Sequence, residues 1–254
     1  MKTRRAAAAA ALTLSLQFLP SCTTTPPPLP PPLALLPAAP AAQAFRPAWP
    51  RPEVLELASA AFECAAREGQ VNRSILTVID YSLPSTEPRL WVIDVLRNQV
   101  LHHELVAHGE GSGGTMAVAF SNQEGSHQSS LGLFRTEEIY TGRFGYSLRL
   151  SGLEPAINDR ARERAIVMHG LSDVSDSFVA QWGTLGRSWG CPAVPAAVAP
   201  QIIDTIAGGS AIFAYYPDAE WLRGSRYVNC QGRPFELANR RNGRVAEVAG
   251  ADPN

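Results

Sequence analysis

The residues best suited to chemistry in this sequence are one cysteine and one histidine, each next to small residues. Cys191 ends the run Gly186–Cys191, which reads Gly-Arg-Ser-Trp-Gly-Cys, and His169 is followed directly by Gly170. A thiol near an imidazole is the minimal pair for nucleophilic acyl transfer, because the imidazole can remove the thiol proton. The two residues therefore predict a nucleophile, Cys191, and its base, His169.

Each residue has an ordinary alternative when it is taken alone. A cysteine after glycine is more often a small core residue, and a histidine at a strand end is more often a hydrogen-bonded structural residue. The arginine, serine, tryptophan and two glycines crowded before Cys191 favour a loop that presents one thiol. We expect the backbone amides of Trp189, Gly190 and Cys191 to form an oxyanion hole, and the helix predicted from Pro195 to favour the thiolate.

The elements that must position this pair are mostly strands. A hydrophobic strand over Ala165–Met168 leads into His169, and a helix over Pro195–Ile206 follows Cys191. An amphipathic helix is predicted over Pro52–Arg67 from its apolar residues at i, i+3 and i+4 spacing. Many short strands with two or three helices indicate a mainly β domain. The other predicted strands are Ile75–Asp80, Leu90–Val95, Val100–Val106, Leu131–Tyr140, Tyr146–Leu150 and Ala211–Tyr216.

The number and positions of the cysteines predict one disulfide and one free thiol. The chain has four cysteines: Cys22, Cys64, Cys191 and Cys230. Cys22 lies in the N-terminal segment, and Cys64 and Cys230 both lie away from the densest motif. In an oxidising compartment these two are the expected disulfide, which leaves Cys191 as the free thiol.

The chain divides into four predicted segments. Residues 1–22 have the basic start and apolar run of a secretory signal, ending in a lipobox-like Leu-Pro-Ser-Cys that predicts lipidation of Cys22; ordinary cleavage near Ser21 is the alternative. Residues 23–51 are rich in proline and alanine and are expected to form a stiff tether. Residues 52–230 form the domain, and residues 231–254 are a polar tail.

Beyond the pair itself, the sequence resembles the L,D-transpeptidase catalytic domain of bacterial peptidoglycan enzymes, whose hallmark is His-Gly followed by Ser/Thr-x-Gly-Cys. It is most similar to the YkuD-like branch with the motif Gly-Arg-Ser-x-Gly-Cys-Pro-Ala, here starting at Gly186. The chain departs from the common form at Trp189, where the family has histidine, and at Ala193, where it has arginine. Further similar segments are Val78–Ser82, Ala107–Gly113, Ser129–Gly132, Asn158-Asp159 and Ile166–Gly170.

The resemblance implies a β-sandwich or barrel and a ping-pong acyl transfer on diaminopimelate-containing stem peptides. The catalytic residues that it implies are Cys191, His169, Gly190, Ser188 and Gly170. Arg187, in place of the missing arginine, and Trp189 and His127 are expected to contact the substrate. An amine acceptor would give a transpeptidase, water a carboxypeptidase, and an existing cross-link an endopeptidase. A non-catalytic envelope lipoprotein that binds stem peptides is the alternative from another class.

Other ligand classes have little support. The net charge of −1 gives no basic field for nucleic acid. His102 and His103 are neighbours on a predicted strand and point to opposite faces, so they cannot share one metal. No zinc-type spacing occurs, and we expect neither a metal nor a cofactor. The expected location is the periplasm or cell envelope, with a lipid anchor at Cys22 as the membrane contact.

Overall fold

The computed structural model describes residues 49–230. The predicted signal segment, Cys22, nearly all of the tether and the polar tail lie outside the described residues. Within that part of the chain, no helix combines the length and apolar character needed to cross a membrane.

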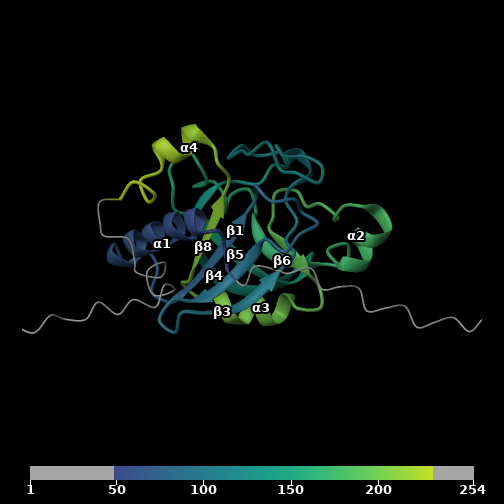
Figure 1. Cartoon of the computed structure of the whole chain (residues 1–254), viewed down its shortest axis with the longest axis horizontal. Coiled ribbons are helices and arrows are strands. Elements are labelled where there is room, and N and C mark those ends of the chain that lie inside the picture. Colours follow the sequence, from purple (N-terminus) through teal and green to yellow (C-terminus); the bar gives the residue numbers. More distant parts are fainter. Residues whose placement is uncertain (1–48, 231–254) are drawn as a thin grey trace, which may run out of the picture. The chain divides into compact units, whose positions relative to one another are not determined.

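The fold is built on one eight-stranded sheet in the order β3-β2-β1-β8-β4-β5-β6-β7 (Figure 1). Two neighbouring pairs, β1 with β8 and β6 with β7, are parallel, and the others are antiparallel. The strands are β1 Ile75–Asp80, β2 Leu90–Asp94, β3 Gln99–Glu104, β4 Gly132–Gly142, β5 Gly145–Gly152, β6 Val167–Leu171, β7 Ala193–Pro195 and β8 Ala211–Tyr215.

The two edges of this sheet meet just after β3. The amide of Ala107 donates to the carbonyl of Ala193 in β7, at 2.8 Å, and the two residues form an isolated antiparallel bridge. The sheet is therefore a nearly closed barrel, and its closing point lies two residues from Cys191. The predicted mainly β class is confirmed.

Four α-helices and one short 3-10 helix accompany the strands of the described chain, more than the two or three predicted. Helix α1 packs against β1 and β8, and α3 packs against β6, β1 and β5 (Figure 1). The helices are α1 Pro52–Arg67, η1 Glu110–Ser112, α2 Asp176–Trp182, α3 Ala199–Ile206 and α4 Ala219–Gly224.

Helix α1 has the predicted bounds, because the residues at its two ends and its apolar face all favour a helix over this range. Pro52 occupies the first turn, where a missing amide hydrogen is harmless, and Gly69 follows the end with φ +69°. Val54, Leu55 and Ala58 are fully or almost fully buried on the face that meets the sheet. The helix is thus held mainly by burial of one face.

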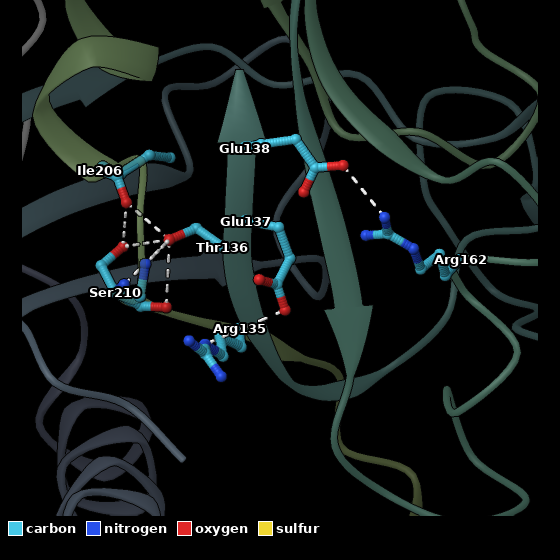
Figure 2. Close-up of polar contacts among 8 residues, drawn as sticks. Arg135, Thr136, Glu137, Glu138, Arg162, Ile206 and Ser210 are labelled. Atoms are coloured by element: carbon cyan, nitrogen blue, oxygen red, sulfur yellow. Dashed lines mark hydrogen bonds and ion pairs between the residues drawn. The ribbon is translucent and has the colours of Figure 1, made fainter. Parts of the chain in front are cut away.

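The end of α3 is joined to β4 through a buried polar cluster (Figure 2). The hydroxyl of Thr136 donates to the carbonyl of Ile206 at 2.7 Å and accepts from the amide of Ser210 at 2.9 Å. The hydroxyl of Ser210 also donates to the carbonyl of Ile206. These hydroxyls give the Ile206 carbonyl, in the last turn of α3, hydrogen-bond donors that its own helix does not supply.

The predicted disulfide between Cys64 and Cys230 is confirmed, and Cys191 is the free cysteine of the described chain. The bridge joins residues 166 positions apart and ties α1 to the segment after α4. It therefore closes almost the whole domain into one loop.

We expect a Cys64→Ser/Cys230→Ser double variant to be less stable by about 2–4 kcal/mol, because a long loop is no longer closed in the unfolded chain. Urea unfolding monitored by circular dichroism measures the difference. Equal midpoints for the variant and the wild type would contradict a stabilising role for the bridge.

Two boundaries near the thiol differ from the predictions. The helix predicted from Pro195 begins at Ala199, because Pro195 ends β7 and Pro200 is the proline in the first helical turn. The strand predicted over Ala165–Met168 runs instead over Val167–Leu171, after a turn in which Ala165 has φ +53°. His169 therefore lies inside β6 and not beyond its end.

Candidate active site

Cys191 and His169 line the same cavity, whose volume is about 400 Å³. His169 comes from β6, and Cys191 comes from the loop that precedes β7. Of the other predicted site residues, Arg187, Ser188 and Trp189 also line it, whereas Gly170, Gly190 and His127 do not. The remaining lining residues are Tyr140, Arg143, Phe144, Arg164, Ala165 and Leu171.

The cysteine loop is held against the chain that follows β3. The amide of Ser188 donates to the carbonyl of His108 at 3.1 Å, and the amide of Glu110 donates to the carbonyl of Ser188 at 2.8 Å. The hydroxyl of Ser188 donates to the carbonyl of Cys191 at 2.6 Å and accepts from the amide of Gly190 at 3.2 Å. Ser188 therefore fixes the turn that presents the thiol.

Gly190 is required by both conformation and space. Its φ of +112° lies in a region that side chains rarely adopt, and a Cβ there would lie 2.7 Å from the carbonyl oxygen of Gln128. The amide of Gly190 already donates to the hydroxyl of Ser188. Of the three amides predicted to form an oxyanion hole, this one is therefore not free to bind an oxyanion.

The sulfur of Cys191 is buried and weakly contacted. The amide of Val167 donates to Sγ at 3.5 Å, and Sγ donates to the carbonyl of Ala165 at 3.8 Å. Burial raises the pKa of the thiol to about 11, although the Val167 amide and the Arg164 guanidinium favour the anion. The prediction of a thiolate favoured by a helix start was wrong, because α3 begins only at Ala199 and burial dominates.

We accordingly expect the alkylation rate of Cys191 to keep rising with pH beyond about 9, where an ordinary exposed thiol levels off. Iodoacetamide labelling from about pH 6 to about pH 10.5, quantified on the peptide that contains Cys191, measures this. The range passes the ordinary thiol pKa of about 8.5 and stays below about 11, so the rate should not reach a plateau within it. A plateau near neutral pH would show a thiolate already formed at rest and contradict the expectation.

The carbonyl of Gly170 orients the ring of His169. Its Nδ1 lies 2.9 Å from the carbonyl of Gly170, and a carbonyl can only accept, so Nδ1 carries the proton. Nε2 is then the unprotonated nitrogen; it is buried and has no hydrogen-bond partner among residues 49–230. Burial lowers the pKa of His169, although the bond to Gly170 acts in the opposite direction. No hydrogen bond joins His169 to Cys191 in the described structure.

A row of stacked side chains borders the cavity. Phe144 stacks on the ring of His169 with centroids 4.4 Å apart, and the ring of Trp189 stacks on His127 at 4.8 Å. The guanidinium of Arg143 lies 5.6 Å from the Phe144 ring and 5.5 Å from the Trp189 ring, and so connects the two stacks. His127, predicted to contact substrate, is thus placed on the rim, where its Nδ1 also lies 2.7 Å from Glu110.

The cavity is lined by three guanidinium groups, from Arg143, Arg164 and Arg187, and by no carboxylate of the described chain. This concentration of positive charge contrasts with the net charge of −1 for the whole chain. Arg187 also donates to the carbonyl of Gly113 at 3.2 Å. A ligand that carries carboxylates would suit this lining.

The sequence predictions missed Arg143, Phe144 and Arg164. Arg143 and Phe144 form the tip of the β4–β5 hairpin, between Gly142 and Gly145, and an exposed aromatic residue at such a tip is the one signal that could have indicated them. Arg164 lies in an irregular turn and gives no comparable signal.

The described residues offer no convincing metal site. Their one group of suitable ligand atoms is Cys64, Glu68 and Cys230, in which both sulfurs belong to the disulfide. His102 contacts Thr205, whereas His103 stacks on Trp91, so the two side chains lie apart as predicted.

Comparison with known proteins identifies a family for this chain. Residues 49–215 match the family model described as "L,D-transpeptidase catalytic domain". No curated protein gives a significant match.

Solved structures with similarity to the chain include an L,D-transpeptidase from Mycobacterium smegmatis, with 13% identity and a TM-score of 0.35, over 56% of this chain and 59% of that one. They also include the helical cell shape determining protein Pgp2 from Campylobacter jejuni, with 11% identity and a TM-score of 0.36, over 71% of this chain and 63% of that one. The chain thus spans about three fifths of the length of these structures.

Proposed function

The chain belongs to the L,D-transpeptidase catalytic domain family, and from this premise we propose that it is a cysteine acyltransferase acting on diaminopimelate-containing stem peptides of peptidoglycan. The observation that carries the proposal is the shared cavity, which is lined both by a free thiol and by an imidazole whose Nε2 has no hydrogen-bond partner among the described residues.

The first half-reaction is acylation of the enzyme. His169 Nε2 accepts the proton of Cys191 as the sulfur attacks the carbonyl of diaminopimelate, and the amides of Trp189 and Cys191 stabilise the oxyanion. Collapse of the tetrahedral intermediate breaks the bond to the terminal D-alanine. The leaving amine takes the proton back from His169, and a thioester remains on Cys191.

The second half-reaction transfers the acyl group. The amine of a second stem attacks the thioester, gives its proton to His169 and forms a 3→3 cross-link, while the thiolate of Cys191 is released and reprotonated. With water as acceptor the same site would act as a carboxypeptidase, and with a cross-linked donor as an endopeptidase.

The test is incubation of the purified protein with disaccharide tetrapeptides, followed by mass spectrometry of products and protein. Loss of D-alanine with formation of dimers would establish a transpeptidase, and loss of D-alanine without dimers a carboxypeptidase. Tripeptide stems, which have no D-alanine to release, are the matched control.

The second candidate is a non-catalytic stem-binding lipoprotein. The raised pKa of Cys191 and its missing hydrogen bond to His169 are the observations that favour it. Saturable binding of tetrapeptides with no product and no acyl adduct would support this candidate and overturn the first.

We also propose a location in the cell envelope, supported by the family and by the N-terminal segment of the sequence. A lipid on Cys22 would then anchor the domain to a membrane through the proline-rich tether. The mass of the mature N-terminal peptide distinguishes a lipidated Cys22 from ordinary cleavage near Ser21.

A further inference from the structure

Arg164 lines the cavity with Cys191 but belongs neither to the His169-Gly170 motif nor to the Gly186–Cys191 motif. It lies in the turn before β6 and is half-buried. All its hydrogen bonds go to neutral oxygens, and no carboxylate of the described residues pairs with it. Within that part of the chain, the positive charge of this half-buried guanidinium is therefore not neutralised by a carboxylate.

The guanidinium is fixed by one segment, Ser121–Ser130, which crosses beside the cysteine loop. Nη1 donates to the carbonyl of Ser121 at 2.7 Å and to the hydroxyl of Ser130. Nη2 donates to the carbonyl of Gln128 at 2.7 Å and to the hydroxyl of Ser126 at 3.3 Å. The planar guanidinium donates to four acceptors, which hold its charge in one orientation. The flexible side chain of a lysine would not be held in this way.

The same segment contacts the cysteine loop. Gln128 O and Arg164 Nη2 both lie against Gly190, at 2.7 Å and 3.4 Å from the position that a Cβ would take. The hydroxyl of Ser129 donates to the carbonyl of Gly190 at 3.3 Å. Arg164 thus packs on the residue that precedes the nucleophile.

The charge acts on the sulfur in the direction that catalysis needs. Burial raises the pKa of Cys191, and the Arg164 guanidinium acts in the opposite direction and lowers it. Burial lowers the pKa of Arg164, and the sulfur of Cys191 opposes that effect. Arg143 and Arg187 also line the cavity, but of the three arginines it is Arg164 that lowers the pKa of Cys191. Tyr81 is buried with a raised pKa, and His169 is neutral.

We propose that Arg164 is a positioning residue that clamps the segment Ser121–Ser130 onto the cysteine loop and holds a permanent positive charge toward Cys191, stabilising the sulfur anion as His169 removes its proton. The catalytic part of this inference rests on the proposed function.

The test compares Arg164→Gln and Arg164→Lys with a matched control, Arg162→Gln. Arg162 lies two residues away, is exposed, and pairs with Glu138 at 3.0 Å on the surface (Figure 2). The readouts are the pH dependence of iodoacetamide alkylation at Cys191, the melting temperature, and kcat and KM on tetrapeptides.

We expect Arg164→Gln to lower the alkylation rate by about tenfold at a pH of about 8, roughly half a unit below the ordinary thiol pKa. It should lower kcat in parallel, since an opposite charge near a thiol shifts its pKa by about one unit. Arg164→Lys should recover most of the alkylation rate, because it keeps the charge, but only part of kcat. Arg162→Gln should match the wild type in both.

Unchanged alkylation in a folded Arg164→Gln variant would overturn the inference. An equal loss of alkylation rate in Arg164→Lys and Arg164→Gln would also overturn it. The hydrogen bonds of the guanidinium alone would then explain the loss, and the positive charge would have no effect. If Arg164→Gln fails to fold, Arg164→Lys is compared with the wild type. An alkylation rate within about threefold of the wild-type rate supports the role of the charge, and a larger loss of rate contradicts it. Alkylation needs no stem peptide, so this result is separable from a failure of the proposed function.

Discussion

A Cys191→Ala variant is expected to lose all acyl transfer and to form no covalent adduct with tetrapeptide donors. Cys191 is the free thiol of the described chain, and the one serine of that chain that lines the cavity, Ser188, donates its hydroxyl proton to the carbonyl of Cys191. The contacts of its sulfur are long, at 3.5 and 3.8 Å, so its removal should cost about 1 kcal/mol or less of folding free energy. Intact-mass spectrometry with donor present, and a thermal melt, measure the two effects.

The control is Cys191→Ser, which keeps the shape of the side chain but replaces the thiol with a much weaker nucleophile. It should also be inactive and should bind donor peptide as the wild type does. D-alanine release by Cys191→Ala at more than a trace of the wild-type rate would show that the nucleophile lies elsewhere.

A His169→Gln variant should show the second largest effect, a fall in the acylation rate of about 10³-fold. With a thiol pKa of about 11, the thiolate fraction at pH 7 is on the order of 10⁻⁴, so attack depends on a base that removes the proton during the reaction. The carbonyl of Gly170 fixes the tautomer that leaves Nε2 available for this role. Glutamine keeps much of the side-chain volume but is no base.

The pH profile distinguishes loss of a base from loss of shape. Because burial lowers the pKa of His169, the imidazole stays neutral to lower pH than an ordinary histidine, and the acid limb of kcat/KM should lie below about 6.5. The His169→Gln variant should lack that limb. His102→Gln, on the outer strand β3, is the matched control and should keep it; a limb that persisted in His169→Gln would assign the base to another group.

Local patterns predicted the elements whose signals are contained in a few neighbouring residues. Helix α1 follows from the spacing of Val54, Ala58 and Ala61 after Pro52, and it has the predicted bounds. The disulfide followed from the placement of Cys64 and Cys230 away from the motif. Helix α2 was missed because it has only seven residues, although Ser175 caps its start and Gly183 its end.

The features that depend on distant segments were not predictable in this way. The ionisation of Cys191 is set by burial among residues from β6, the turn before it and the cysteine loop, and reasoning from a nearby helix start gave the wrong direction. The stacked rim needs the β4–β5 hairpin tip with Phe144 to reach His169, and the clamp needs Arg164 to reach Gln128. Neither pair is close in the sequence.

The closure of the barrel between Ala107 and Ala193 also affects which cysteines pair when the chain is oxidised. Disulfide exchange proceeds through the thiolate, and a buried thiol with a pKa of about 11 supplies almost none near neutral pH. Because Cys191 is buried two residues from this closing point, we expect it to compete poorly with Cys64 and Cys230 once the two sheet edges have met. The fold thereby protects its reactive sulfur from mispairing, and the interval before closure is the one in which a scrambled bridge could form.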